Sequence, residues 1–300
     1  MRFLTTIRKR GLSQSQLAAL LMLPALIVIF LITFYPLAQT FLFSLEDYNV
    51  KFAAARKFVG PGNYIKLFFD PDFRAALRQT IFFTVVSVSA EFVLGLLVAL
   101  VIHRTFPGRG LVRAAVLVPW AIPTVISARM WEWMYNDQFG VINDILVKLH
   151  LIPAPVPWLG QPATAMWAII VTDVWKTTPF MALLLLAGLQ IIPEELYEAA
   201  KIDGAGTWQR FWRVTLPLLR PAILVALIFR TLDAFRVFDV VFVLTRGASG
   251  TRTLVVMNQE VFFSFLEFGY GSAISVLVFV FVALFSFLYM RGLGLRLEAA

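Results

Sequence analysis

Six long apolar runs divide this chain, and polar segments separate them. The runs cover residues 17–37, 80–102, 114–134, 165–189, 222–245 and 272–290. Each holds about 19 to 25 residues, enough for a helix that rises about 1.5 Å per residue to cross the hydrocarbon core of a bilayer. The pattern therefore predicts an all-α integral membrane protein with six transmembrane helices.

The polar segments set the predicted topology. Residues 1–16 are polar and basic, and the apolar run after them is too long for a signal peptide and lacks a small-residue cleavage site. We expect an uncleaved first span with a cytoplasmic N-terminus, and six spans return the C-terminus to the same side. The basic loop residues favour this orientation only modestly, because many lie in the first outer loop. The expected plan is a cytoplasmic tail at 1–16, a membrane domain at 17–290 and a cytoplasmic tail at 291–300.

The composition agrees with a membrane protein and excludes other classes. Hydrophobic residues make up 60% of the chain and charged residues 15%, which is far too apolar for a soluble domain. The net charge of +8 resides in loops between apolar runs, so it indicates membrane topology rather than nucleic-acid binding. The absence of cysteine excludes disulfides, cysteine metal sites and thiol catalysis. We expect no metal site and no catalytic residue.

The polar stretch at 190–220 has the residues of a helical hairpin. Pro193 suits the start of a helix, and the Asp203-Gly204 pair suits its end, because glycine accepts the left-handed conformation of a sharp turn. Thr207 is the expected N-cap of a second short helix over 208–214. The prolines at 217 and 221 are expected to close that helix and open the next span.

This hairpin resembles the conserved cytoplasmic loop of bacterial ABC-importer permeases. The matching residues are Glu198, Ala199, Ala200, Gly204 and Pro217, with Val214 in place of the usual Ile; Asp203 and Phe211 also look like the carbohydrate-uptake branch. The resemblance implies a coupling loop over 193–217 that docks on a separate ATPase subunit. Without the resemblance, the same stretch reads as an ordinary amphipathic connector.

Charged residues inside the predicted spans are the second notable feature. Burying an ionised side chain in lipid costs at least about 2.5–3.5 kcal/mol, so these groups should face protein or water. Many lie three residues apart with opposite sign, a spacing that allows pairing on one helix face. The candidates for a substrate path are Asp173, Trp175, Lys176, Arg230, Asp233, Arg236 and Asp239, with further charges at Glu91, Arg129 and Glu132. Structural ion pairing and a polar path for sugar hydroxyls both explain them.

The spans themselves resemble those of sugar permeases. The segments at 58–64, 173–180 and 235–245 look like that branch, and most of the chain is similar to trehalose- and maltose-type permeases. The resemblance implies an ABC type I importer fold in the bacterial inner membrane. It also implies a second permease, expected to be a different chain, two ATPase subunits and an external sugar-binding protein. No G-x-x-x-x-G-K-[ST] phosphate loop occurs, so ATP is expected to bind the partner subunit, and no cofactor is expected here.

One alternative stays open from the residues alone. Intramembrane Asp and Glu residues also serve as proton relays in ion-coupled secondary transporters. That reading explains the buried charges but leaves the hairpin at 193–217 without a role.

Overall fold

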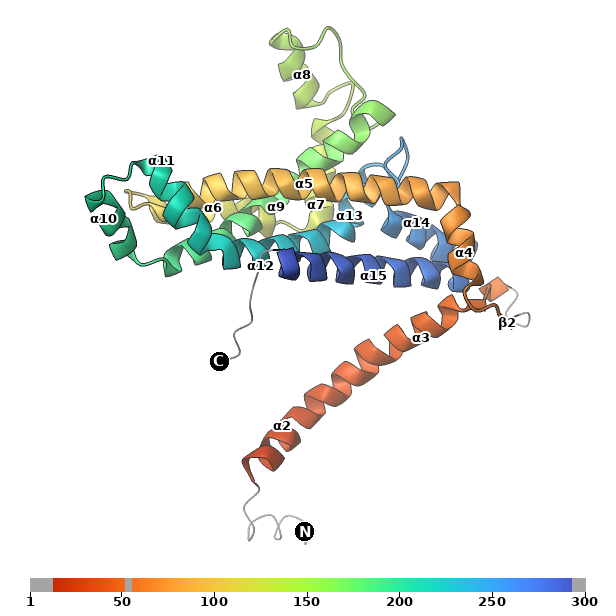
Figure 1. Ribbon diagram of the computed structural model, residues 1–300. Coiled ribbons are helices and arrows are strands. Elements are labelled where there is room, and N and C mark those ends of the chain that lie inside the picture. The colour runs from red at the N-terminus through yellow and green to blue at the C-terminus, as the bar shows by residue number, and fades with distance from the viewer. Residues whose placement is uncertain (1–12, 52–55, 293–300) are drawn as a thin grey trace, which may run out of the picture.

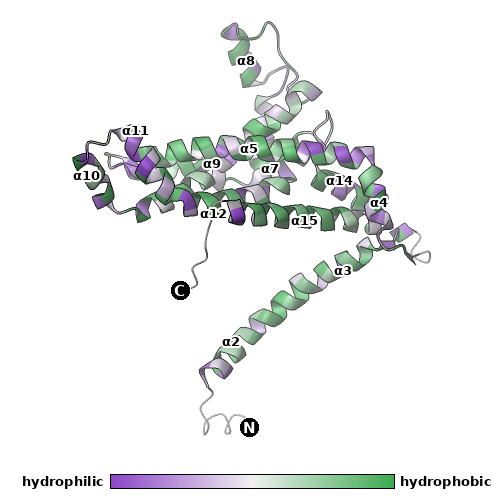
Figure 2. Cartoon of the chain, viewed as in Figure 1, coloured by the Kyte–Doolittle hydropathy of each residue, from purple (hydrophilic) through white to green (hydrophobic). Residues whose placement is uncertain are grey.

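The computed structural model describes residues 13–51 and 56–292, so most of the predicted N-terminal tail and residues 293–300 lie outside the described part. Four long helices run side by side as a bundle: α5 (Pro71–His103), α9 (Pro162–Ile191), α12 (Leu216–Phe235) and α15 (Phe268–Gly292) (Figure 1). Figure 2 shows that hydrophobic residues cover these helices along most of their length. The architecture is the all-α membrane fold that the apolar pattern predicts, apart from one small hairpin of strands.

Small residues allow the bundle helices to approach closely. A Cβ atom at Gly95 of α5 would come 2.6 Å from Cγ of Met181 on α9. A Cβ atom at Gly188 of α9 would clash with Ala222 and lie 2.8 Å from Leu219 on α12. In membranes, where lipid is as apolar as the helices, such close backbone packing is a main source of helix association.

The first predicted span forms a rod that leaves the bundle (Figure 1). It consists of α2 (Gln14–Ile29), a π-helical segment (Phe30–Phe34) and α3 (Tyr35–Ser44). Ser13 begins it with a capping box, in which its hydroxyl accepts from Gln16 N–H and its own N–H donates to Gln16 Oε1. No residue of α2 is buried, so its apolar surface is available to lipid or to another subunit.

The third predicted span is not one straight helix. It consists of α6 (Arg109–Ala121) and α7 (Thr124–Met134), which meet at a bend of 90°. Proline disfavours helical geometry in the residue before it and has no N–H to donate, so Ile122-Pro123 ends α6. The prediction of a continuous helix over 114–134 was therefore wrong. The described residues contain five helices long enough to span a membrane, or six if this bent pair counts as one span.

The fifth predicted span is also broken. Helix α12 ends at Phe235, and a short helix α13 (Asp239–Leu244) follows after three residues. The amides of Arg236 and Val237 close tighter turns onto Asp233 O and Ala234 O, both at 3.1 Å. The predicted span over 222–245 is present within one apolar stretch, Thr207–Leu244, but the helix is interrupted at residues 236–238, so Asp239 does not continue the α12 face that carries Arg230.

The remaining elements lie between the long helices. They are β1 (Glu46–Asp47), paired antiparallel with β2 (Lys57–Phe58), then α4 (Gly62–Phe69), α8 (Val141–Lys148), α14 (Leu254–Glu260) and a π-helical segment (Val261–Phe265). Asn63 is buried and donates to Ser44 O at 2.9 Å and Glu46 O at 2.8 Å, which fixes α3 to α4. Helix α8 projects away from the bundle (Figure 1).

Candidate functional site

A buried cluster of charges joins three of the bundle helices. Arg230 of α12 is 2% exposed and donates to both oxygens of Glu91 on α5, with Nη2 at 2.8 Å from Oε1. The same guanidinium contacts Asp173 of α9 and lies 2.7 Å from Oδ2 of Asp233. Thr177 donates to Glu91 Oε1 at 2.8 Å. Glu91, Asp173 and Arg230 therefore form one ion-paired group in the bundle interior.

Each buried charge in this cluster is stabilised by the opposite charges around it. A buried ion is stable only when partners replace the water it has lost, and the loss of one partner leaves an uncompensated charge. Arg230 supplies positive charge to two buried carboxylates, and Lys176, one helical turn beyond Asp173, is also buried. The structural explanation of the intramembrane charges therefore holds for Arg230 and Asp173.

A polar cavity of about 200 Å³ lies beside this cluster. Six of the seven residues predicted for a substrate path line it: Asp173, Lys176, Arg230, Asp233, Arg236 and Asp239. Asp233 has 73% of its side chain exposed, so it reaches from the buried pair with Arg230 into the cavity. Asp239, the first residue of α13, also lines the cavity. The cavity therefore combines fixed charges with accessible hydrogen-bonding groups.

Two features of the cavity were not assigned by sequence reasoning. Thr124, at the start of α7, and Thr177, on α9, also line it. The bend between α6 and α7 brings Thr124 there, and Pro123 is the sequence signal that could have indicated it. Trp120 lines the cavity as well and stacks on Phe180 with ring centroids 5.8 Å apart. An aromatic face beside carboxylates and hydroxyls is suited to the apolar and polar faces of a sugar ring.

Trp175 does not belong to this group. Among the described residues it does not line the cavity, and it packs edge to face on Trp131 with ring centroids 5.6 Å apart. The predicted pairing of charges three residues apart is confirmed for Arg230 with Asp233 and for Arg129 with Glu132, the latter at 2.6 Å. Arg236 instead donates to Leu232 O at 3.1 Å.

The predicted hairpin is present at the end of the bundle opposite α4 (Figure 1). Helix α10 (Glu194–Ile202) ends in a Schellman motif, in which Ala205 N–H donates to Ala200 O at 2.9 Å and Gly204 N–H to Lys201 O at 3.0 Å. Gly204 has φ of 77°, a left-handed conformation that side chains with a Cβ rarely adopt. The predicted role of Gly204 in the turn is therefore confirmed.

The second half of the hairpin differs from the prediction. Helix α11 (Thr207–Arg210) begins after Gly206, whose N–H donates to Gln209 Oε1 at 3.1 Å, so Thr207 is not the N-cap. A π-helical segment (Phe211–Thr215) then continues directly into α12. Pro217 lies in the first turn of α12 and Pro221 inside it, so these prolines do not close a separate helix as predicted.

The hairpin presents a mixed surface to solvent. Glu198, Ala199, Asp203 and Gly204 are exposed, and Ala200, Phe211 and Pro217 are partly buried. Ile202 and Trp208 are 87% and 72% exposed, and Trp208 stacks on Phe211 at 5.9 Å. Exposed apolar side chains that are surrounded by charged residues are typical of a surface that contacts another protein.

Comparisons with known proteins agree on the kind of molecule. Residues 91–294 match the family described as binding-protein-dependent transport system inner membrane component. The chain is 48% identical to the trehalose/maltose transport system permease protein MalF of Thermococcus litoralis, over 93% of this chain and 94% of that protein. It is 41% identical to the trehalose transport system permease protein SugA of Mycobacterium tuberculosis, over 94% and 90% of the two chains.

A solved structure has the same fold. A chain of a bacterial ABC transporter involved in the import of the acidic polysaccharide alginate superposes with a TM-score of 0.82 at 22% identity, covering 99% of this chain and 100% of that chain. A second structure of a bacterial alginate ABC transporter, in complex with an alginate pentasaccharide-bound periplasmic protein, gives a TM-score of 0.80 at 23% identity, covering 97% and 96%.

Proposed function

This chain belongs to the family of binding-protein-dependent transport system inner membrane components, the permeases of ABC importers, and we propose that it carries a disaccharide, trehalose or maltose. The similarity to two permeases named for trehalose, at 48% and 41% identity over nearly the whole chain, supports that choice. The membrane that it spans is, in this proposal, the bacterial inner membrane.

The observation that carries the proposal is the polar cavity beside the Arg230 cluster. Ligand sites for small molecules usually occupy about 300–1,000 Å³, and this cavity of about 200 Å³ is smaller than that range. It is also open at Asp233 and Asp239, which are exposed. We infer that it forms half of the translocation path and that a second permease, a different but homologous chain, completes it.

We further propose that the hairpin over 193–217 couples the path to two ATPase subunits. Its exposed face at Glu198, Asp203 and Trp208 is available for docking. The helix that follows it without a break is the one that carries Arg230, about 21 Å further along α12. A movement of the hairpin would therefore be transmitted along a rigid helix to the polar cavity. An extracytoplasmic sugar-binding protein would deliver the substrate to the opposite side.

Co-purification tests the assembly. We expect the tagged chain in mild detergent to retain an ATPase and a second permease, and we expect Glu198→Lys to lose the ATPase while keeping the permease. Lys148→Glu, a charge reversal on exposed α8, is the matched control. A chain that purifies alone, or whose partners are unchanged by Glu198→Lys, would contradict the coupling role.

Uptake measurements test the substrate and the energy source. Cells that contain the complete system should take up labelled trehalose or maltose, and uptake should require a functional ATPase partner. Uptake that persists without that ATPase and collapses on addition of an uncoupler would instead support an ion-coupled transporter, which the permease relatives do not favour.

A further inference from the structure

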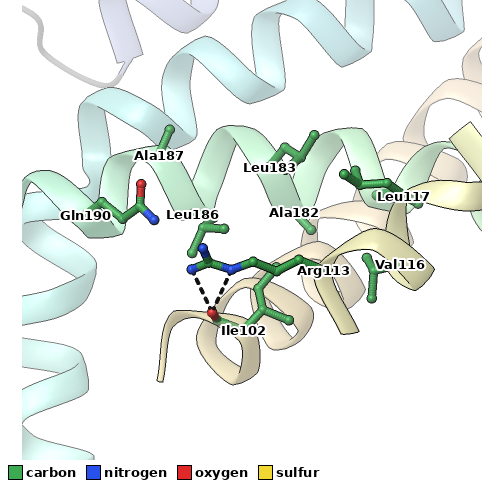
Figure 3. A pocket seen from close by; sticks show the side chains of 10 residues that line it. Ile102, Arg113, Val116, Leu117, Ala182, Leu183, Leu186, Ala187 and Gln190 are labelled. Carbon is green, nitrogen blue, oxygen red and sulfur yellow. Dashed lines mark hydrogen bonds between the residues drawn. The ribbon is translucent and has the colours of Figure 1, made fainter. Parts of the chain in front are cut away.

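A second cavity lies between α5, α6 and α9 (Figure 3). Its volume is about 320 Å³. Most of its lining is aliphatic: Ile102, Val116, Leu117, Ala182, Leu183 and Leu186. Its two polar side chains, Arg113 and Gln190, lie toward the end of the bundle that carries the hairpin. The cavity is therefore an apolar groove with a basic end; we call it the α6 groove.

The basic end carries more than one arginine. Arg104, Arg109 and Arg113 lie on the connection from α5 to α6 and on the first turns of α6. Arg113 donates through Nε and Nη2 to the carbonyl of Ile102, at 3.3 and 3.0 Å, which places its guanidinium over the end of α5 (Figure 3). None of these three arginines forms a salt bridge within the part of the chain that the structure describes. Glu194, Arg109 and Arg113 all lie close enough to His103, at the end of α5, to interact with it electrostatically.

The α6 groove lies nearer the hairpin than the polar cavity does. On α9 its lining begins at Pro179, whereas the cavity is lined by Asp173, Lys176 and Thr177 and also by residues of α12. The groove extends to Gln190, one residue before the end of α9. A groove in this position has room for a headgroup at the end of the helices and for an acyl chain along them.

We propose that the α6 groove binds an anionic phospholipid. The headgroup phosphate would bind Arg113 and Arg109, and one acyl chain would lie over Val116, Leu183 and Leu186. Basic pockets between transmembrane helices near one membrane surface are suited to anionic headgroups, because the phosphate supplies the missing negative charge while the apolar walls hold the chain. The proposal requires that the chain spans a bilayer, and it does not depend on which sugar is carried.

Fluorescence quenching can test this in the assembled transporter. The chain has no cysteine, so Ala187→Cys provides a single site for a bimane label on an exposed residue that lines the groove. The labelled complex is placed in nanodiscs of phosphatidylcholine that contain either brominated phosphatidylglycerol or brominated phosphatidylcholine at the same mole fraction. We expect stronger quenching by brominated phosphatidylglycerol. Val101→Cys, on the exposed face of α5, reports on bulk lipid and should show no preference.

The arginines should set that preference. Arg109→Gln and Arg113→Gln should each weaken the preference for phosphatidylglycerol roughly five-fold, the factor that corresponds to about 1 kcal/mol for one basic residue near an anionic surface. Arg220→Gln, an exposed arginine on α12, is the control and should leave it unchanged. Arg109 makes no hydrogen bond to Ile102, so its variant remains informative if Arg113→Gln does not assemble.

Three outcomes would overturn the proposal. Equal quenching by both brominated lipids would show that the groove does not select an anionic headgroup. Loss of the preference on addition of inorganic phosphate would show that a free anion suffices. A label that neither lipid quenches would show that another subunit covers the groove. None of these results bears on sugar uptake, so failure here is distinguishable from failure of the proposed transport function.

Discussion

The hydroxyl of Tyr197 lies 3.2 Å from Oγ1 of Thr215. Tyr197 is on α10, and Thr215 is the last residue of the π-helical segment that leads into α12. The bond therefore joins the two arms of the hairpin at the point where the hairpin meets the helix of Arg230. Because Thr215 is buried, this contact is fixed by the surrounding packing and is a candidate path for movement between the hairpin and the bundle.

Removal of this hydroxyl should weaken coupling more than stability. Tyr197→Phe loses one hydrogen bond, worth about 1 kcal/mol, and keeps the ring. We expect sugar transported per ATP hydrolysed to fall by about two- to five-fold in proteoliposomes, a loss consistent with one such bond. Tyr289→Phe is the control, because it removes a bond of similar length, 3.0 Å to Thr231, outside the hairpin. Equal losses in both variants would contradict a specific role for Tyr197.

The turn after α10 should tolerate a side chain at one glycine and not at the other. Gly204 has φ of 77°, whereas Gly206 has φ of −65°, and neither has an atom within 4 Å of an added Cβ. The two positions therefore differ in backbone strain, which an added side chain meets at Gly204 and not at Gly206. Gly204→Ala should destabilise the hairpin by about 1 kcal/mol and reduce ATPase association, while Gly206→Ala, at the N-cap of α11, should reduce that association less. Equal binding of the ATPase by the two variants would show that the geometry of this turn is not needed for docking.

Arg230 should be the most sensitive charged position for stability. Arg230→Met leaves Glu91 and Asp173 buried without their counter-ion, and such a change costs about 3–5 kcal/mol. We expect a clear loss of thermal stability in detergent. Arg129→Met removes an exposed pair and should change stability by at most about 1 kcal/mol.

A variant without any of the buried charges distinguishes the cost of an unpaired charge from the cost of altered packing. Arg230→Met combined with Glu91→Gln and Asp173→Asn removes every buried charge of the group, so it should recover much of the stability that Arg230→Met loses. Recovery in the thermal melt, without recovery of transport, is the expected result if the cluster also shapes the polar cavity. No recovery of stability would show that packing, rather than charge, sets the cost.

The helical hairpin and most of the spans could be predicted because their signals are local. Apolar length indicates a span, and the Asp203-Gly204 pair indicates a turn, since each depends on residues adjacent in the chain. The bend at Pro123 was equally local, because proline restricts the residue before it, although a straight helix was expected there.

The break after α12 has no such signal. Arg236, Val237 and Phe238 include neither proline nor glycine. The break is stabilised from elsewhere in the fold: Thr253 donates to the carbonyl of Val237 at 3.3 Å, and Val237 is packed in the core. Likewise, the ion pair of Arg230 with Asp233 could be predicted from a spacing of three residues. The ion pair of Arg230 with Glu91 could not, because those two residues are 139 positions apart in the chain. Contacts of that kind depend on the tertiary arrangement of helices.

Asp233 should contribute to sugar binding rather than to coupling. Its side chain is 73% exposed, lines the polar cavity and is oriented by Arg230 at 2.7 Å. A hydrogen bond from a sugar hydroxyl to a charged acceptor is worth about 1.5–3 kcal/mol, so Asp233→Asn should raise the KM for uptake by about ten-fold. Vmax should change little, because the hairpin is unaltered and Asn at this position keeps the helix of α12.

The control for this last prediction is Asp144→Asn. Asp144 also pairs with a cation, Lys148 at 2.7 Å, and is 55% exposed, but it lies on α8 outside the cavity. Its variant should leave both KM and Vmax unchanged. A KM for Asp233→Asn equal to that of Asp144→Asn would remove Asp233 from the substrate path and leave it as an ion-pair partner. A fall in Vmax at constant KM would place Asp233 in the movement of α12 instead, because the loss would then arise after the sugar has bound.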